Sequence, residues 1–343
     1  MKIIDMHCDT ISALRSIKSH ESDAPDTLLK NRLQIDLPRM KQSGYLLQNF
    51  ALYVNLKEET DPCEAALFMT DLFYKEIEKY PDLIRPVTSY TQIKENMQSN
   101  RVSALLTLEE GEICKGSLSH LRNFYRLGVR MMTLTWNYNN QLGAPNFFPG
   151  YKTDKKDLKS QSENSIPTSG LANPAGLTKK GLEFLSEMEQ LGIIIDVSHL
   201  SDGGFYDVYH HTLRPFVASH SNARALCPNC RNLTDDMIQK IGERGGVIGL
   251  NYYGNFLTEN PNGDNDKSTV QSIARHAKHI ANIGGISCLG LGSDFDGFDG
   301  EAELYDCSTL SLLADALKQS GFTSSDIDRI CYKNVLDFYK EML

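Results

Sequence analysis

The sequence predicts an α/β protein folded as a closed (β/α)8 barrel, or TIM barrel. Short runs rich in β-branched residues alternate with longer amphipathic stretches along the chain, and this alternation is typical of parallel α/β architecture. Several short runs are almost continuously apolar, as at Ile193–Ile195 and Val247–Leu250, which is typical of strands covered on both faces. Eight such runs in 343 residues favour a closed barrel, although the pattern alone leaves an open doubly wound sheet possible.

The predicted strands and helices follow one another from end to end. The eight predicted strands are Lys2–His7, Leu47–Val54, Val102–Leu108, Val129–Thr135, Gly192–Ser198, Phe216–Ser219, Gly246–Asn251 and Cys288–Ser293. Helical spacing of apolar residues predicts helices over Pro62–Tyr80, Leu177–Gln190, Thr234–Arg244 and Thr269–Ile283. Thr234 is a suitable helix N-cap, and Gly284-Gly285 would end the last of these helices.

Two irregular stretches and the absence of repeats complete the predicted organisation. The stretches Asn137–Pro174 and Gly254–Lys267 follow predicted strands, so we expect them to overhang the carboxyl-terminal face of the barrel. Because the chain shows no internal repeat and no low-complexity linker, residues 1–343 are predicted to form a single domain.

Composition narrows the classes of protein to consider. Hydrophobic residues make up 41% of the chain and charged residues 23%, an ordinary globular balance. The net charge of −9 argues against a nucleic-acid partner, which would need a basic surface. No apolar run reaches the roughly 18 residues of a membrane span, and the first residues do not resemble a signal peptide. The sequence therefore predicts a cytoplasmic protein without a membrane partner.

Some cysteines and histidines are interpreted as structural. The eight cysteines are scattered, and the pair Cys227 and Cys230 lacks a second pair that could complete a Cys₄ zinc site. Most cysteines are therefore predicted to be reduced and buried. Several histidines fall in predicted helices or other segments away from the strand ends, so packing or solvation is expected for them: His20, His120, His210, His211, His276 and His279.

Potential metal ligands collect where the predicted strands end. In the first strand, His7 and Asp9 are two residues apart and can therefore share a face. Four other strands end in Glu109-Glu110-Gly111-Glu112, Asp196-Val197-Ser198-His199, Ser219-His220-Ser221 and Ser293-Asp294-Phe295-Asp296. In a barrel these ends meet at one rim, and imidazole with carboxylate suits Zn²⁺. A carboxylate between two ions would allow two-metal hydrolysis.

As an ordered set, these motifs resemble those of the membrane (renal-type) dipeptidase family, especially its soluble bacterial branch. The resemblance extends from Asp5 to Gly297 and includes Leu127–Thr135, Gly192–His199 and Ser219-His220-Ser221 followed by Arg231-Asn232-Leu233. It implies a metallo-dependent hydrolase with a (β/α)8 barrel. The implied reaction is hydrolysis of dipeptides by a two-zinc-activated water, including dipeptides with a D-residue at the C-terminal position. The family also favours homodimers.

The resemblance implies a role for each site residue. It gives the following ligands for two Zn²⁺ ions: His7 and Asp9 for the first, His199 and His220 for the second, and Glu109 as the bridge. Of three neighbouring glutamates, Glu109 has the family's spacing to the Thr133-Leu134-Thr135 block. Asp294 matches the carboxylate that transfers protons near the scissile bond. Arg231 matches the residue that binds the terminal carboxylate of the substrate.

The chain departs from the mammalian members of this family at two positions in the substrate pocket. Trp136 stands where they have a substrate-contacting histidine, and Phe256 stands where they have a tyrosine. Neither position supplies a metal ligand, so hydrolysis should survive while the range of substrates changes. Asn137 or Asn251 could supply a hydrogen bond in place of the missing groups.

Three other functions are compatible with parts of the pattern. A two-metal amidase or deacylase acting on N-acyl amino acids would use the same site, and the apolar Trp136 and Phe256 suit it. Phosphoesterases and nucleobase hydrolases on such barrels usually begin with a His-x-His motif, whereas this chain has His7-Cys8-Asp9. A binding protein that has lost activity is disfavoured because all five ligands and Asp294 are retained.

Overall fold

The computed structural model describes residues 1–21, 23–146, 173–258 and 267–343. Within these residues, eight parallel strands close into a barrel, because β1 pairs with both β2 and β9, and β2 also pairs with β4. The barrel strands are β1 (Ile3–Asp5), β2 (Tyr45–Tyr53), β4 (Val102–Glu109), β5 (Val129–Thr133), β6 (Ile194–Asp196), β7 (Val217–Ala218), β8 (Val247–Leu250) and β9 (Leu289–Leu291). The predicted fold and all eight predicted strands are confirmed.

A further strand, β3 (Ile84–Val87), was not predicted. It pairs with the first half of β4, from Val102 to Leu105, and β5 pairs with the second half. The strand is only four residues long and contains Arg85 and Pro86, so neither its pattern nor its composition is typical of a strand. It lies beside the closed ring of eight strands, at the end of the sheet order.

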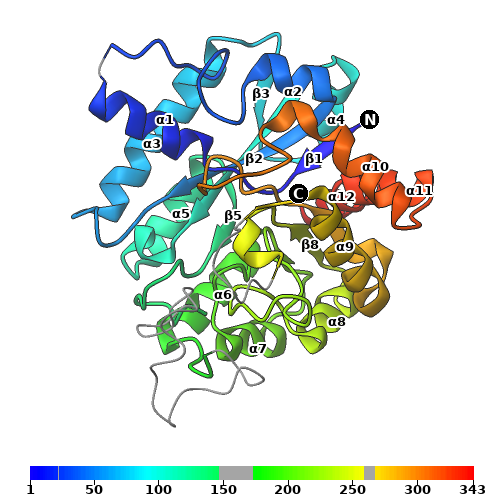
Figure 1. Cartoon of the computed structure of the whole chain (residues 1–343). Helices are drawn as coiled ribbons and strands as arrows, with labels where there is room; N and C mark the ends of the chain where they lie inside the picture. Colours follow the sequence, from blue (N-terminus) through cyan, green and yellow to red (C-terminus); the bar gives the residue numbers. More distant parts are fainter. Residues whose placement is uncertain (22, 147–172, 259–266) are drawn as a thin grey trace, which may run out of the picture.

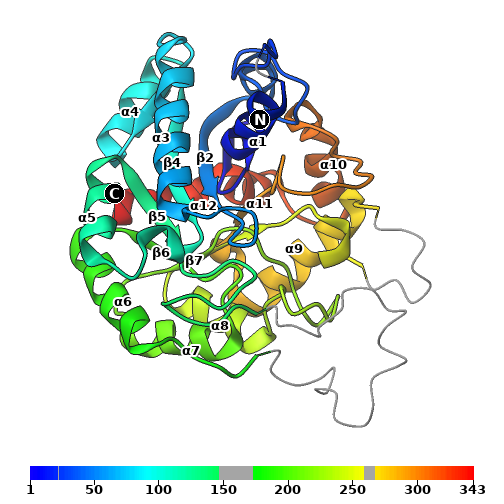
Figure 2. The ribbon, with the colours of Figure 1, turned by 90° about the vertical axis from the view of Figure 1, so that its left-hand side faces the viewer.

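Helices surround the barrel. They are α1 (Thr10–His20), α2 (Leu37–Ser43), α3 (Pro62–Glu78), α4 (Tyr90–Gln98), α5 (Leu118–Arg126), α6 (Lys179–Leu191), α7 (Asp202–His211), α8 (Asp235–Glu243), α9 (Val270–Gly284), α10 (Ser311–Gln319), α11 (Ser324–Asp328) and α12 (Asn334–Met342). Figure 1 shows α3, α5, α6, α7, α8 and α9 following one another in chain order around the strands, and Figure 2 shows the same layer after a quarter turn.

The four predicted helices are confirmed as α3, α6, α8 and α9. The Thr234 side chain accepts a hydrogen bond from the Met237 backbone N–H at the start of α8, as its N-cap position predicts. Gly285 ends α9 with a positive φ of 85°, a conformation that glycine adopts without a steric penalty. None of the described helices is both long and apolar enough to cross a membrane.

An apolar plug fills the interior of the barrel. Ile4, Leu47 and Leu105 from the strands pack there against Val335 and Phe338 of α12. A larger hydrophobic cluster lies between the strands and the surrounding helices. Because α12 contacts residues near the amino-terminal ends of the strands, the opposite end of the barrel remains for polar groups.

Only parts of the two predicted overhanging loops fall within the described residues. From the first stretch, residues 137–146 and 173–174 are described, and from the second, residues 254–258 and 267. The prediction for 147–172 and 259–266 lies outside the described residues. Gly254–Phe256 forms a short 3₁₀ helix after β8.

Candidate metal centre

The carboxyl-terminal ends of β1 and β4 bring one group of three possible metal ligands together. The Nε2 atom of His7 lies 3.3 Å from Oδ2 of Asp9 and 3.3 Å from Oε2 of Glu109. All three side chains are buried. The expectation that His7 and Asp9 point to the same side of the chain is therefore confirmed.

A second group forms on the other oxygen of Glu109. Its Oε1 lies 3.1 Å from Nε2 of His199 and 3.5 Å from Nε2 of His220, and these two nitrogens are 3.0 Å apart. His199 follows β6 and His220 follows β7. The ring of His220 stacks on the ring of His7, with centroids 3.8 Å apart, so the two groups adjoin.

The spacing of the ligand atoms fits divalent metal ions. Bonds of about 2.0–2.1 Å from a tetrahedral metal ion place its ligand atoms roughly 3.3 Å from one another. The five distances from the histidine nitrogens given above are 3.0–3.5 Å, close to that separation, and all ligand atoms of each group lie within 4.8 Å of one another. Among the described residues, three overlapping groups could hold a metal ion: His7 with Asp9 and Glu109, Glu109 with His199 and His220, and His7 with His220 and Asp294.

The electrostatics of the centre also suit a cation. Burial alone would raise the pKa of Glu109, but the three neighbouring imidazoles outweigh it and hold this pKa well below its usual range. Burial, with the nearby Glu109 charge, raises the pKa of Asp9 to about 6. Burial, reinforced by the Arg231 charge, lowers the pKa of His199 to about 4, so its imidazole is neutral and available as a ligand.

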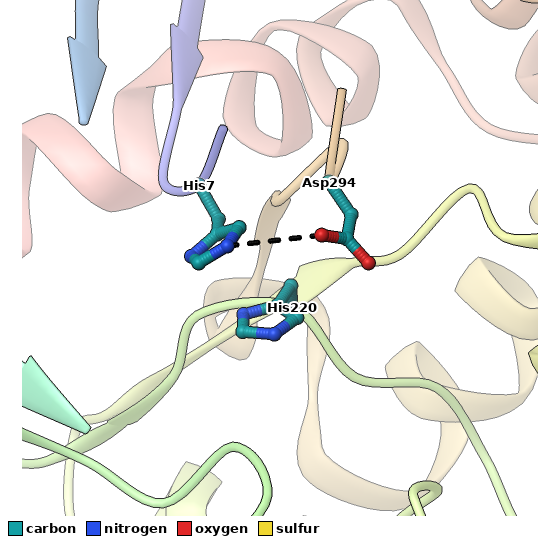
Figure 3. A group of neighbouring side chains, drawn as sticks. All are labelled: His7, His220 and Asp294. Carbon is teal, nitrogen blue, oxygen red and sulfur yellow. Dashed lines mark ion pairs between the residues drawn. The ribbon is translucent and has the colours of Figure 1, made fainter. Parts of the chain in front are cut away.

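Asp294 adjoins the centre from the end of β9. Its Oδ1 lies 3.7 Å from Nε2 of His7, and its Oδ2 accepts a hydrogen bond of 2.9 Å from the side-chain amide of Asn251. Figure 3 shows its carboxylate directed at His7, with the His220 ring beside both. Burial and the nearby Asp9 and Glu109 carboxylates raise the pKa of Asp294 to about 7, although His7 opposes this shift.

Backbone strain is concentrated around the centre. Among the described residues, six other than glycine have a positive φ, and four of them adjoin this site: Glu110, His199, Asp294 and Asp296. Such conformations cost on the order of 1–3 kcal/mol each and cluster at functional sites. The strained backbone at these four residues therefore costs stability but directs their side chains at and around the centre.

The neighbouring glutamates point away from the centre. Glu110 accepts hydrogen bonds from the Trp136 backbone N–H and from the Asn140 side chain, and Glu112 accepts two from Gln141. Both glutamates therefore hold the loop after β5. Of the three candidates that the sequence offers, only Glu109 is in contact with the histidines.

A cavity of about 860 Å³ opens onto the centre. Asp9, Glu109, His199 and Asp294 form part of its wall. The aromatic part of the wall includes Tyr53, Trp136, Tyr253, Phe256 and Phe298. The Trp136 ring meets that of Tyr53 edge-on at 4.9 Å, and its centroid is 6.1 Å from that of His199. The cavity therefore joins buried charge to flat apolar surface.

Arg231 lies beneath this wall, and only 5% of its surface is exposed. It donates hydrogen bonds to the hydroxyl of Ser221 and to the backbone carbonyl of His220, and its guanidinium carbon is 5.3 Å from the centre of the Phe256 ring. Its buried Nε has no hydrogen-bond partner among the described residues. Arg231 and Asn251 thus lie behind the cavity lining, whereas Trp136 and Phe256 form part of it.

Other expectations from the sequence concern the remaining histidines and the cysteines. His20, at the end of α1, is exposed and hydrogen-bonded to the carbonyl of Ser16, in line with the expected solvation, and it is also one of the residues that line the cavity. His276 is buried, and His279 pairs with Asp235 on α8, in line with structural roles. All eight cysteines are free thiols, with seven of them buried. The cavity residues Tyr53, Tyr253 and Phe298 were not predicted because they lack the residue types of a metal motif.

The fold and this centre define a metal-dependent hydrolase built on a barrel. The membrane dipeptidase family, peptidase family M19, matches residues 1–342, and the chain belongs to this family. Its members include metallopeptidases and dipeptidases, so the chain is a hydrolase acting on peptide bonds.

Individual relatives extend this assignment. An uncharacterised protein of Klebsiella pneumoniae, encoded in the pqqA 5′ region, is 34% identical over 249 residues, covering 72% of this chain and 85% of that protein. Dipeptidase aclJ of Aspergillus oryzae is 29% identical over 313 residues, covering 88% of this chain and 68% of that protein. A crystal structure of a metallopeptidase from Rhodobacter sphaeroides, liganded with a phosphinate mimic of the dipeptide L-Ala-D-Ala, has a TM-score of 0.84 and 25% identity, covering 100% of this chain and 99% of that one.

Proposed function

We propose that the chain is a two-zinc dipeptidase in which Glu109 bridges the two ions. The observation that carries this proposal is the division of the Glu109 carboxylate between two groups. Its Oε2 is 3.3 Å from His7, and its Oε1 is 3.1 Å from His199. Imidazole and carboxylate ligands at these spacings suit zinc. His7 and Asp9 would hold the first ion, and His199 and His220 the second.

Asp294 is proposed as the group that moves the proton. When bound, zinc would acidify a water molecule and polarise the carbonyl of the scissile bond. Asp294 lines the cavity, with its Oδ1 within 4 Å of Nε2 of His7, so this oxygen could accept a proton there and return it to the leaving amine. The Asn251 amide holds the other oxygen and thereby fixes the direction of the carboxylate.

Arg231 is proposed to attract the terminal carboxylate of the dipeptide. A guanidinium group can bind a carboxylate through two parallel hydrogen bonds, and the unpaired Nε leaves one donor available. The ring of Phe256 lies over this guanidinium, so the two residues would bind the C-terminal residue of the substrate together. The L-Ala-D-Ala mimic bound by the Rhodobacter sphaeroides relative supports acceptance of a D-residue at this position. The aromatic lining supports a preference for apolar side chains.

Metal content and substrate range test this proposal together. Full-length protein saturated with zinc should hold two ions per chain, whereas Glu109→Ala should hold neither tightly, because each group would lose one of its three ligands. Glu112→Gln is the matched control, since the Glu112 carboxylate accepts hydrogen bonds from Gln141 of the neighbouring loop. The loaded enzyme should cleave dipeptides far faster than N-acyl amino acids or phosphoesters. No more than one ion at saturating zinc would contradict the bridge, and preferred cleavage of acyl amino acids would favour a deacylase. The homodimer implied by the resemblance stays a prediction.

A further inference from the structure

A chain of hydrogen-bonded side chains supports His220 on the side away from Glu109. The Nδ1 atom of His220 is 2.7 Å from the hydroxyl of Ser219, and this hydroxyl is 2.5 Å from Oδ2 of Asp196. All three side chains are at most 1% exposed. Neither Ser219 nor Asp196 is one of the five proposed metal ligands, and neither takes part in the proton transfer proposed for Asp294.

The hydrogen bonds of Asp196 determine which atom donates in each hydrogen bond between Asp196, Ser219 and His220. Its Oδ1 accepts from the backbone N–H groups of Ser198 and Ser219, at 3.0 and 2.9 Å. Its Oδ2 accepts from the hydroxyls of Ser219 and Thr133, at 2.5 and 2.9 Å. With four donors directed at it, Asp196 acts only as an acceptor, as an ionised carboxylate does.

The proton of His220 then has one possible position. The hydroxyl of Ser219 has a single proton, which it donates to Asp196, so toward His220 it can only accept. The proton of the neutral imidazole must therefore be on Nδ1. This leaves the lone pair on Nε2, the atom that faces Glu109 and His199.

Among the described residues, His199, the other histidine in contact with Oε1 of Glu109, has no charged group behind the hydrogen-bond partner of its Nδ1. The Nδ1 atom of His199 is 2.9 Å from the side-chain oxygen of Asn137, a neutral acceptor on the loop after β5. His220 is instead backed through Ser219 by a negative charge at the end of β6. The direct partner of His220 is also neutral, but the hydrogen bond from Ser219 to Asp196 is charge-assisted, and such bonds are roughly twice as strong as those between neutral groups.

We propose that Asp196 and Ser219 are positioning residues that fix the tautomer of His220 and strengthen its Nε2 as a metal ligand. The inference rests on the proposed function, because it takes His220 to be a ligand of the second zinc ion. Groups that orient ligating histidines in this way typically contribute 10- to 100-fold to metal affinity. The same carboxylate also joins the end of β6 to the segment after β7 through the backbone N–H groups of Ser198 and Ser219, so it fixes the position of the ring as well as its proton.

Two substitutions test the chain of hydrogen bonds. Ser219→Ala removes the acceptor for the Nδ1 proton. Asp196→Asn keeps the shape but places an amide N–H where Oδ2 accepted, so the Ser219 proton turns to Nδ1 of His220 and moves the imidazole proton to Nε2. Each variant should bind one of its two zinc ions about 10- to 100-fold more weakly, measured on the full-length protein by competition with a chromogenic chelator. The other ion should bind as it does in the wild type.

Thr133→Val is the matched control. It removes another hydrogen bond from the same Asp196 oxygen without contacting His220, so it should lower thermal stability and leave both zinc affinities unchanged. Nitrogen-15 NMR of the zinc-free proteins should find the His220 proton on Nδ1 in the wild type and on Nε2 in Asp196→Asn.

Three results would overturn the inference. In the first, Ser219→Ala and Asp196→Asn bind both ions as tightly as the wild type. In the second, Thr133→Val weakens zinc binding as much as they do, which would reduce the effect to a general loss of stability. In the third, the wild type binds fewer than two ions, a result that contradicts the proposed function itself and is recognised before any variant is compared.

Discussion

Asp294 differs from the other two carboxylates of the centre, Asp9 and Glu109, in its distance from His7 and in its hydrogen-bond partner. Asp9 and Glu109 are both 3.3 Å from the His7 ligand atom, whereas Asp294 is 3.7 Å away. Its second oxygen is fixed by the amide of Asn251 rather than by an imidazole. These differences support the proposal that Asp294 transfers protons.

Replacing Asp294 by asparagine should therefore separate catalysis from metal binding. We expect Asp294→Asn to keep both zinc ions and to lower kcat by about 10²-fold or more, the usual scale for loss of a general acid–base. Elemental analysis and steady-state kinetics on one dipeptide measure the two effects. Asp296→Asn is the control, because that carboxylate is engaged with Thr10 and Gln34 and should matter far less. Unchanged turnover in Asp294→Asn would assign the proton transfer to another group.

The placement of Arg231 leads to a prediction about the C-terminal carboxylate of the substrate. A dipeptide should be cleaved about 10- to 100-fold better in kcat/KM than its C-terminal amide, because a hydrogen bond to a charged group is worth roughly 1.5–3 kcal/mol. Arg231→Ala should remove most of this difference by slowing the acid alone. Arg231→Lys, which keeps the charge but not the planar fork, should lie between the two. Equal rates on acid and amide in the wild type would rule out a carboxylate contact.

At the scale of single residues, the sequence predicts some features better than others. The sequence predicts the pairing of His7 with Asp9 from the two-residue period of a strand. The contact is present, although both residues follow β1 and Asp9 is the N-cap of α1. Choosing Glu109 over Glu110 needed the family spacing, because the positive φ of Glu110 that turns it toward the loop after β5 has no simple sequence signal. The contact of Asp196 with Ser219 depends on the pairing of β6 with β7, which no local pattern gives.

At the scale of elements, helix α9 supports two loops of the site through one buried histidine. The Nδ1 atom of His276 accepts from the backbone N–H of Ala223, so its proton is on Nε2, which donates to the carbonyl of Leu257 at 2.8 Å. Ala223 lies three residues after His220, and Leu257 follows Phe256. Burial, with smaller contributions from the Arg275 and His279 charges, lowers the pKa of His276 to about 4.

This shifted pKa makes stability depend on pH. In the unfolded chain a histidine titrates near 6.5, whereas folded His276 stays neutral down to about pH 4. Its contribution is therefore complete above about pH 6.5 and falls as the pH drops toward 4, by up to about 3 kcal/mol. We expect His276→Leu to destabilise the protein most at about pH 7.5 and least at about pH 4.5. Urea unfolding of both proteins across this range measures it, and a difference that grew with acidity would contradict the assignment.

The strands illustrate what sequence patterns predict at this scale. Runs such as Val247–Leu250 are apolar throughout because both faces of a barrel strand are covered, and such runs were recognised. The strand Ile84–Val87 was missed because Arg85 and Pro86 separate its two buried apolar residues, so the segment has neither an apolar run nor an alternating pattern. It is specified by pairing with β4, a contact that forms only in the folded chain.

At the scale of the whole molecule, the centre joins strands that are far apart in the barrel. Its possible ligands follow β1, β6 and β7 and end β4, and the ring of strands closes between them. Asp9, His7 and Asp294 lie near one another although Asp294 comes from the last strand. Metal ions held here would therefore link the two ends of the chain to its middle.

Zinc should consequently stabilise the entire fold rather than one loop. An ion that binds only the folded state adds RT ln(1 + [L]/Kd), about 2.7 kcal/mol when its concentration is 100 times its Kd. The buried, like-charged pair Asp9 and Glu109 gives a further reason, because their mutual repulsion in the metal-free protein is relieved by a cation. We expect the thermal midpoint to rise with zinc concentration and to fall when a chelator removes the metal.

Calorimetry of the wild type, Glu109→Ala and Glu112→Gln tests whether the stabilisation by zinc depends on the bridging carboxylate of Glu109. Glu109→Ala should lose most of the zinc-dependent increase, since both groups share that carboxylate. Without zinc the same substitution should also lower stability, because the depressed pKa of Glu109 reflects a net attraction of its carboxylate to the three histidines, which Asp9 only partly opposes. Glu112→Gln should keep the full zinc response. A midpoint that rises equally in all three proteins would mean that zinc stabilises the barrel from another site, and the bridging role of Glu109 would have to be abandoned.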